Sequence, residues 1–213
     1  MQALQFLAKA AARGLGDRKT ICLGLALIAL GGLGKLALPG MANIETVLVA
    51  SLVAGSLLGR WWTVVVPLGA ILLQQLVAWE SLYPGHGAEV IAGITFFVAT
   101  GYLFVGVAGR RLKPRMVARV GSVALLTTVS VPLTIAYDLW TDVGEWYFIA
   151  RPVGVDFWTV LQLQVPFTAY HIISSLVFVP LFGSVFLWAQ AYLTHRSSSA
   201  PSPADEKSPV AEG

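Results

Sequence analysis

Acidic and aromatic side chains gather in one stretch of this chain, residues 138–157. Trp140 and Trp146 stand there beside Asp142 and Glu145, so ring faces that could stack on a ligand lie next to carboxylates that could orient it. Trp and Tyr also anchor proteins at membrane interfaces, and we leave that role open for each single residue. The density of the cluster favours a segment that closes over a small-molecule ligand.

A second polar set follows at helical spacing in residues 158–193. Gln164, Thr168, His171 and Ser175 are separated by four, three and four positions, and a similar face runs along the preceding segment through Thr127, Ser130, Thr134, Asp138 and Thr141. A polar face in lipid is costly unless it is turned toward protein or a water-filled cavity. We therefore expect the two faces to look at each other or at a ligand.

The members of these faces differ in what they can do. Hydroxyl groups commonly bond across packed helices or back to their own backbone, and this is the favoured interpretation for the threonines and serines. Gln164 and His171 have several hydrogen bonds to satisfy, so we predict that they contact the ligand from the side opposite the segment 138–157.

Membrane-spanning helices must position these residues. The chain has 213 residues, 56% hydrophobic and only 12% charged, with a mean hydropathy of +0.74, which one water-soluble core cannot accommodate without a large exposed apolar surface. Long apolar runs without alternation predict helices rather than barrel strands. The fold class predicted is an all-α, six-helix membrane bundle, with spans at residues 20–38, 45–59, 61–79, 88–108, 120–137 and 158–193. The last span is longer than one crossing needs, which predicts a lead-in over 158–165 and a break near Pro166.

The distribution of basic residues predicts the orientation. Twelve of the fourteen Lys and Arg residues would share one side by the positive-inside rule, with Arg151 on the other and Lys35 near the outer end of the first span. Both termini would then be cytoplasmic, in the plasma membrane of a prokaryote. We divide the chain into an interfacial segment (1–19), the transmembrane domain (20–193) and a disordered cytoplasmic tail (194–213).

Small residues in the second span mark a packing seam. Ala50, Ala54 and Gly55 belong to adjoining rows that allow another backbone to approach closely. The seam could face a helix of the same chain or form an interface with a partner subunit, and the sequence leaves both possibilities open.

Five short motifs carry a resemblance to a known family. The chain resembles the substrate-binding S components of energy-coupling factor (ECF) transporters, and more closely an uncharacterised membrane family related to them, through Asn43-Ile-Glu-Thr, Ala54-Gly-Ser-Leu-Leu-Gly, Val66-Pro-Leu, Asp138-Leu-Trp-Thr-Asp-Val-Gly-Glu-Trp and Val165-Pro-Phe. The resemblance implies capture of a vitamin-like or other small molecule from the outer side, with Asn43 among the ligand contacts. It also implies docking on a membrane scaffold driven by two ATPases.

Other classes fit less well. A non-catalytic accessory subunit of a larger membrane complex is the alternative, in which the polar faces are buried contacts. The sequence contains no P-loop, HExxH, CxxC or GxSxG motif, so we expect no enzyme activity, metal or cofactor, and coupling to ATP would need partner chains. The predicted outer side has seven carboxylates and one basic residue, Arg151, so its charge favours a cationic or neutral ligand. The basic residues of the other side would contact lipid headgroups, and we do not expect the chain to bind nucleic acid.

Overall fold

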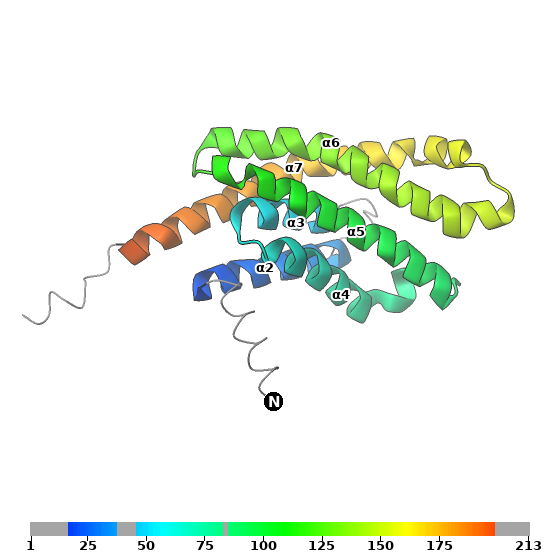
Figure 1. Ribbon diagram of the computed structural model, residues 1–213, viewed down its shortest axis with the longest axis horizontal. Helices are drawn as coiled ribbons and strands as arrows, with labels where there is room; N and C mark the ends of the chain where they lie inside the picture. Colours follow the sequence, from blue (N-terminus) through cyan, green and yellow to red (C-terminus); the bar gives the residue numbers. More distant parts are fainter. Residues whose placement is uncertain (1–16, 38–45, 83–84, 199–213) are drawn as a thin grey trace, which may run out of the picture.

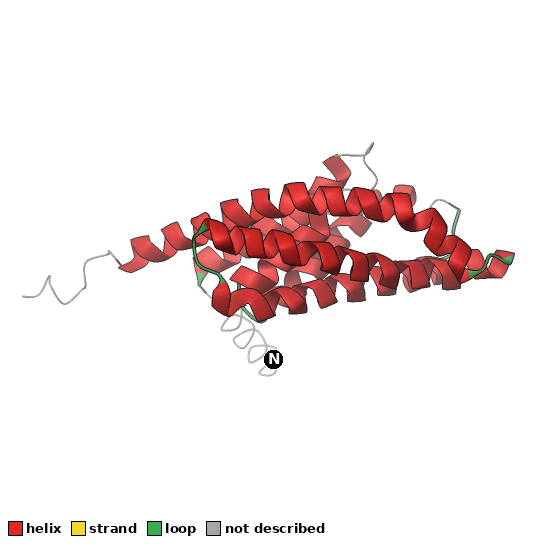
Figure 2. Cartoon of the chain, turned by 90° about the horizontal axis from the view of Figure 1, so that it is seen from above, coloured by secondary structure: helices red, strands yellow, loops and turns green. Residues whose placement is uncertain are grey.

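The computed structural model describes residues 17–37, 46–82 and 85–198, and this part of the chain is all-α. It contains six α-helices that run along one long axis (Figures 1 and 2). Their bounds are α2 Arg18–Ala37, α3 Thr46–Leu57, α4 Trp62–Leu82, α5 Ala88–Leu112, α6 Val120–Glu145 and α7 Phe157–Ser198. Residues 1–16 of the predicted interfacial segment, the tail beyond Ser198, and Asn43 lie outside the described residues.

Helix α3 is the centre of the bundle. All twelve of its residues are buried, and it packs against α2, α4, α5, α6 and α7 (Figure 1). A helix that is apolar on every side is stable only when other elements bury it, and the five neighbouring helices do so here. The core therefore runs along α3 and the faces turned toward it.

Glycines bring α3 and α5 into backbone contact. A Cβ atom added to Gly55 would lie 2.0 Å from the carbonyl oxygen of Gly106, and one added to Gly109 would lie 2.6 Å from that of Leu52. On the opposite side, Ala50 of α3 packs against Gly31 of α2. The small-residue seam thus faces the chain's own helices. Ala50, Ala54 and Gly55 are fully enclosed, so this fold does not offer them to a partner subunit.

The contact between α3 and α5 yields the first prediction. Gly55→Ala forces the two backbones apart, and we expect it to destabilise the protein by about 1–3 kcal/mol, as overpacking usually does. The matched control is Gly183→Ala in α7, where the added Cβ would meet Leu126 at an ordinary 3.4 Å. Thermal unfolding in detergent measures both variants. Equal melting temperatures for the two variants would contradict this packing.

Side chains from other helices bind the carboxyl end of α3. Gln190 Nε2 donates to the carbonyl oxygen of Leu57 at 3.0 Å, and Lys113 Nζ donates to that of Leu58. These carbonyls have no partner inside α3, and a cation near a helix carboxyl terminus is also favoured by the helix dipole. The two contacts tie α7 and the turn that follows α5 to the end of the central helix.

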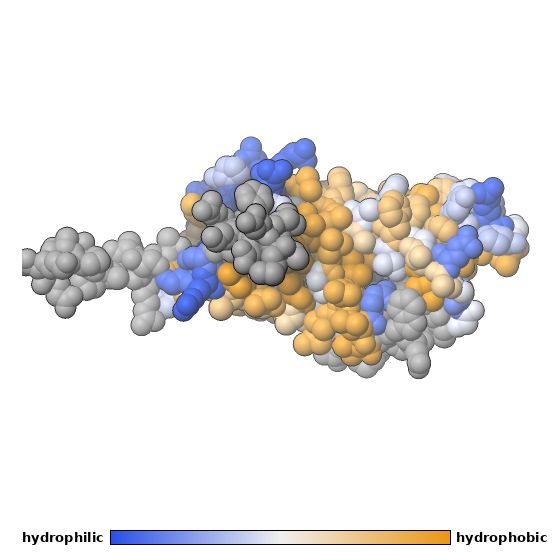
Figure 3. Space-filling view, turned by 60° about the horizontal axis from the view of Figure 1, so that its bottom comes forward, coloured by the Kyte–Doolittle hydropathy of each residue, from blue (hydrophilic) through white to orange (hydrophobic). Residues whose placement is uncertain are grey.

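Three helical stretches are long and apolar enough to cross a membrane: Ala88–Arg115, Val120–Val153 and Phe157–Leu193. Two shorter apolar helices, Thr46–Leu57 and Trp62–Val77, lie beside them. An apolar band covers the middle of the face shown in Figure 3, and hydrophilic residues gather toward both ends of the long axis. Large apolar side chains such as Leu72 and Leu76 of α4 point outward, as in a protein surrounded by lipid.

Two sequence predictions about the last helices are wrong. The segment predicted as an outer loop continues α6 to Glu145 and then forms a π-helical turn, Trp146–Ala150, and a 3-10 turn, Arg151–Val153. Before Pro152 the segment contains only one glycine, Gly144, which is buried within α6, and Gly154 ends the run with a left-handed φ of 82°. Helix α7 is likewise continuous through Pro166, where no break occurs. Proline is tolerated in such helices when local adjustments satisfy the freed carbonyl.

Candidate functional site

Helix α6 has an aromatic face that packs on α5. Tyr137 stacks on Tyr102 with ring centroids 4.6 Å apart, and Trp140 lies 4.7 Å from Phe97. The indole Nε1 of Trp140 donates to Thr100 Oγ1 at 2.9 Å. Both the ring and the indole N–H of Trp140 therefore contact α5.

The polar face of α6 is turned toward α7. Asp138, Asp142 and Glu145 occupy positions i, i+4 and i+7, and therefore one side of the helix. On the facing side of α7, Gln164, Thr168 and His171 repeat the same spacing. Because the two helices are antiparallel, Asp138 meets His171 and Glu145 meets Gln164.

Hydrogen bonds fix this antiparallel register at three levels. Glu145 Oε2 accepts from Gln164 Nε2 at 2.6 Å, and Asp138 Oδ1 lies 2.7 Å from His171 Nδ1. Deeper in the bundle, the hydroxyl oxygens of Thr134 and Ser175 are 2.9 Å apart. This last pair confirms the interpretation of these two hydroxyl groups as bonds between packed helices.

A cavity of about 280 Å³ opens between the paired levels. Asp138 is only 4% exposed, and its Oδ2 atom has no hydrogen-bond partner among the described residues. Asp142 is 6% exposed and accepts no side-chain hydrogen bond within this part of the chain. The cavity is lined by Asp138, Thr141, Asp142, Glu145, Gln164, Phe167, Thr168 and His171. It thus combines three carboxylates with one phenyl ring and one imidazole, and no Lys or Arg lines it.

The other predicted ligand contacts lie elsewhere. Trp146 does not line the cavity: its indole donates to the carbonyl oxygen of Val155 at 3.2 Å and its ring packs edge-on against Phe157. Arg151 lies over the rings of Trp146 and Tyr147. These contacts stabilise the turn between α6 and α7. Asn43 is outside the described residues.

Asp156 has a structural partner at the start of α7. Its carboxylate accepts hydrogen bonds from the hydroxyl group of Thr159 at 2.6 Å and from the Thr159 backbone N–H at 3.1 Å. These bonds favour the ionised form and hold the pKa of Asp156 below its ordinary value. Asp156 thus acts as the cap of α7 rather than as a cavity residue.

Four lining residues were not among the predicted ligand contacts: Asp138, Thr141, Phe167 and Thr168. Asp138 precedes Asp142 by four positions, and Phe167 and Thr168 lie between Gln164 and His171. Helical spacing from the residues already chosen was the signal that could have found them. No three His, Cys, Asp or Glu side chains in the described residues are grouped as a metal site requires.

A comparison with protein families matches residues 16–199 to a family of unknown function. The chain belongs to DUF6580. No curated protein and no solved structure matches it. The range matched to DUF6580 spans all six described helices, so the α6–α7 cavity lies within the family's own region.

Proposed function

We propose that this DUF6580 protein is an integral membrane protein that binds a small molecule in the α6–α7 cavity and serves as the substrate-binding component of an uptake transporter. One observation carries the proposal. A carboxylate that is 4% exposed, Asp138, keeps an unpartnered oxygen at a cavity that also contains Asp142. Buried ionisable groups in an apolar bundle are expensive, and they are retained where they bind something.

Helix packing alone does not account for the cavity. If the two polar faces served only to join α6 and α7, each polar group would be paired, as the Thr134–Ser175 and Glu145–Gln164 contacts are. A pocket of about 280 Å³ beside Asp142 instead leaves space for a small ligand.

The transporter part of the proposal draws on the resemblance to ECF S components. It is supported by the six-helix architecture and by the cavity's place near the α6–α7 turn. Coupling would come from other chains, since the sequence has no nucleotide-binding motif. A scaffold would bind at a surface other than the Ala50–Gly55 seam, which is buried.

The proposed orientation rests on the basic residues that gather at one end of the bundle. The amino end of α2, the α3–α4 and α5–α6 connections and the carboxyl end of α7 lie at one end of the bundle (Figure 1). Four basic residues belong to those two connections, Arg60, Lys113, Arg115 and Arg119, and Arg110 and Arg111 lie beside them in the last turn of α5. By the positive-inside rule this end is cytoplasmic, and the α6–α7 turn with its cavity is on the outer side.

Thiol labelling tests this orientation. Cys22 is exposed, so it is first replaced by Ser, and single cysteines are then introduced as Val153→Cys and Arg115→Cys. A membrane-impermeant maleimide added to intact cells is expected to label Cys at 153 and to reach position 115 only after lysis. The reverse pattern, or equal labelling of both positions from outside, would contradict the orientation.

Native mass spectrometry tests the function. Protein released gently from its own membranes is expected to retain a small molecule, together with a membrane scaffold and ATPase subunits. Thr168→Trp fills the cavity without changing its charge, and it should abolish the retained molecule while the partners remain. A protein without ligand, in a fixed complex that lacks ATPases, would contradict the proposal and indicate an accessory subunit.

A further inference from the structure

We propose that the ligand is a small organic amine, protonated and with at least one N–H group, whose ammonium group is bound by Asp142. This inference rests on the proposed function, because it names the chemical class that the α6–α7 cavity takes. It goes beyond that function in assigning one residue as the main determinant of specificity.

The pairing of the two helices leaves Asp142 as the available carboxylate. Glu145 is bonded to Gln164, and one oxygen of Asp138 is bonded to His171. Since 138 pairs with 171 and 145 with 164, the antiparallel register sets Asp142 level with Phe167 and Thr168. Neither of these side chains can neutralise a carboxylate.

The charge of the lining selects a cation. Three carboxylates line the cavity, and the one group there that can carry positive charge is His171. A buried carboxylate without a counter-charge is strongly unfavourable, so a ligand that brings one positive charge gains most from Asp142 and from the free oxygen of Asp138.

The spacing of the carboxylates favours an organic cation over a metal ion. Asp138, Asp142 and Glu145 are on successive turns of α6, which separates them by roughly 4.5–6 Å along the helix axis at 1.5 Å per residue. A metal ion requires its oxygen ligands to converge at about 2–2.6 Å, and among the described residues no three His, Cys, Asp or Glu side chains are grouped so closely. An extended ligand with one ammonium group fits a row of acceptors better than a compact ion does.

The chemistry of the lining also favours N–H donors. Carboxylate oxygens and the hydroxyl oxygens of Thr141 and Thr168 are hydrogen-bond acceptors. Quaternary ammonium groups have no N–H and are usually held by cages of several aromatic rings, whereas Phe167 is the one aromatic residue of this lining. The lining therefore favours an amine that donates N–H hydrogen bonds.

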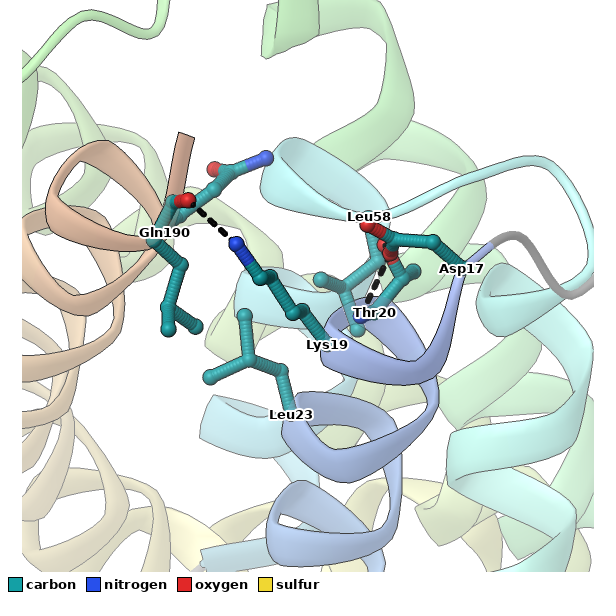
Figure 4. A pocket seen from close by; sticks show the side chains of 7 residues that line it. Asp17, Lys19, Thr20, Leu23, Leu58 and Gln190 are labelled. Carbon is teal, nitrogen blue, oxygen red and sulfur yellow. Dashed lines mark hydrogen bonds between the residues drawn. The ribbon is translucent and has the colours of Figure 1, made fainter. Parts of the chain in front are cut away.

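Two other cavities in the described part of the chain do not offer such a site. The groove at Trp140 and Phe104, between α5 and α6, has no charged lining. In the pocket at the basic end, Lys19 Nζ donates to the carbonyl oxygen of Leu193, and Asp17 accepts from Thr20 (Figure 4). Their polar groups are already engaged with the protein.

Three probes of similar shape test the inference. Benzylamine, benzyl alcohol and benzyltrimethylammonium are titrated into the purified full-length protein in lipid nanodiscs at neutral pH, by isothermal calorimetry. We expect benzylamine to bind at least tenfold more tightly than either of the others. Asp142→Asn keeps the shape of the side chain and should weaken benzylamine binding by tenfold or more. Glu89→Gln, the same charge change at an exposed position at the start of α5, should leave it unchanged.

A stability measurement separates binding from folding. Asp142→Asn removes a buried carboxylate that no side chain bonds, so the empty variant should unfold at the same or a higher temperature than the natural protein. A lower melting temperature would mark Asp142 as a structural residue and overturn the inference. Benzyl alcohol or benzyltrimethylammonium binding as tightly as benzylamine, or no binding of benzylamine, would also overturn it. The proposed function would survive if the natural protein retained a neutral or anionic molecule that Thr168→Trp abolishes.

Discussion

The structure depends on a single electrostatic constraint, the presence of three carboxylates on consecutive turns of a helix in an apolar bundle. Carboxylates are costly on an apolar outer surface, and α6 turns the side that carries Asp138, Asp142 and Glu145 toward another helix. Helix α7 meets it with Gln164 and His171, and the two resulting bonds set the antiparallel register. The same rotation directs the aromatic face of α6 at α5, where Tyr137 stacks on Tyr102.

The packing around α3 determines how deep the polar region reaches. Toward the basic end, the α6–α7 contact becomes apolar: Leu126 and Val179 are fully buried and Leu187 is 3% exposed. The side-chain hydrogen bonds between α6 and α7 thus end at the Thr134–Ser175 pair, and Ser130, one turn further along, bonds to the carbonyl oxygen of Thr127 in its own helix. A cavity closed at this end suits a protein that holds its ligand rather than one that conducts ions through a continuous polar path. At the same end of the bundle, the glycine contacts of α3 with α5 bring the two backbones too close to admit even a Cβ atom.

Part of this arrangement could be predicted from the sequence. Apolar runs located all six helices, and helical spacing predicted that Gln164 and His171 share a face, since both signals depend only on residues near in sequence. The direction of Trp140 could not be predicted, because it depends on Thr100 and Phe97 of another helix. The continuity of α7 through Pro166 was missed for a similar reason, since whether a proline breaks a helix depends on its surroundings. The small-residue pattern of α3 revealed close packing, and only the fold showed which helix occupies the seam.

The central claim is that the space beside Asp142 holds a ligand. The most direct test is a crystal structure of the protein purified gently from its own membranes, without added ligand. The account predicts non-protein electron density between Asp142 and Thr168, within hydrogen-bonding distance of the Asp142 carboxylate. Collapse of the cavity, with Asp142 bonded directly to a side chain of α7 and no further density, would contradict it.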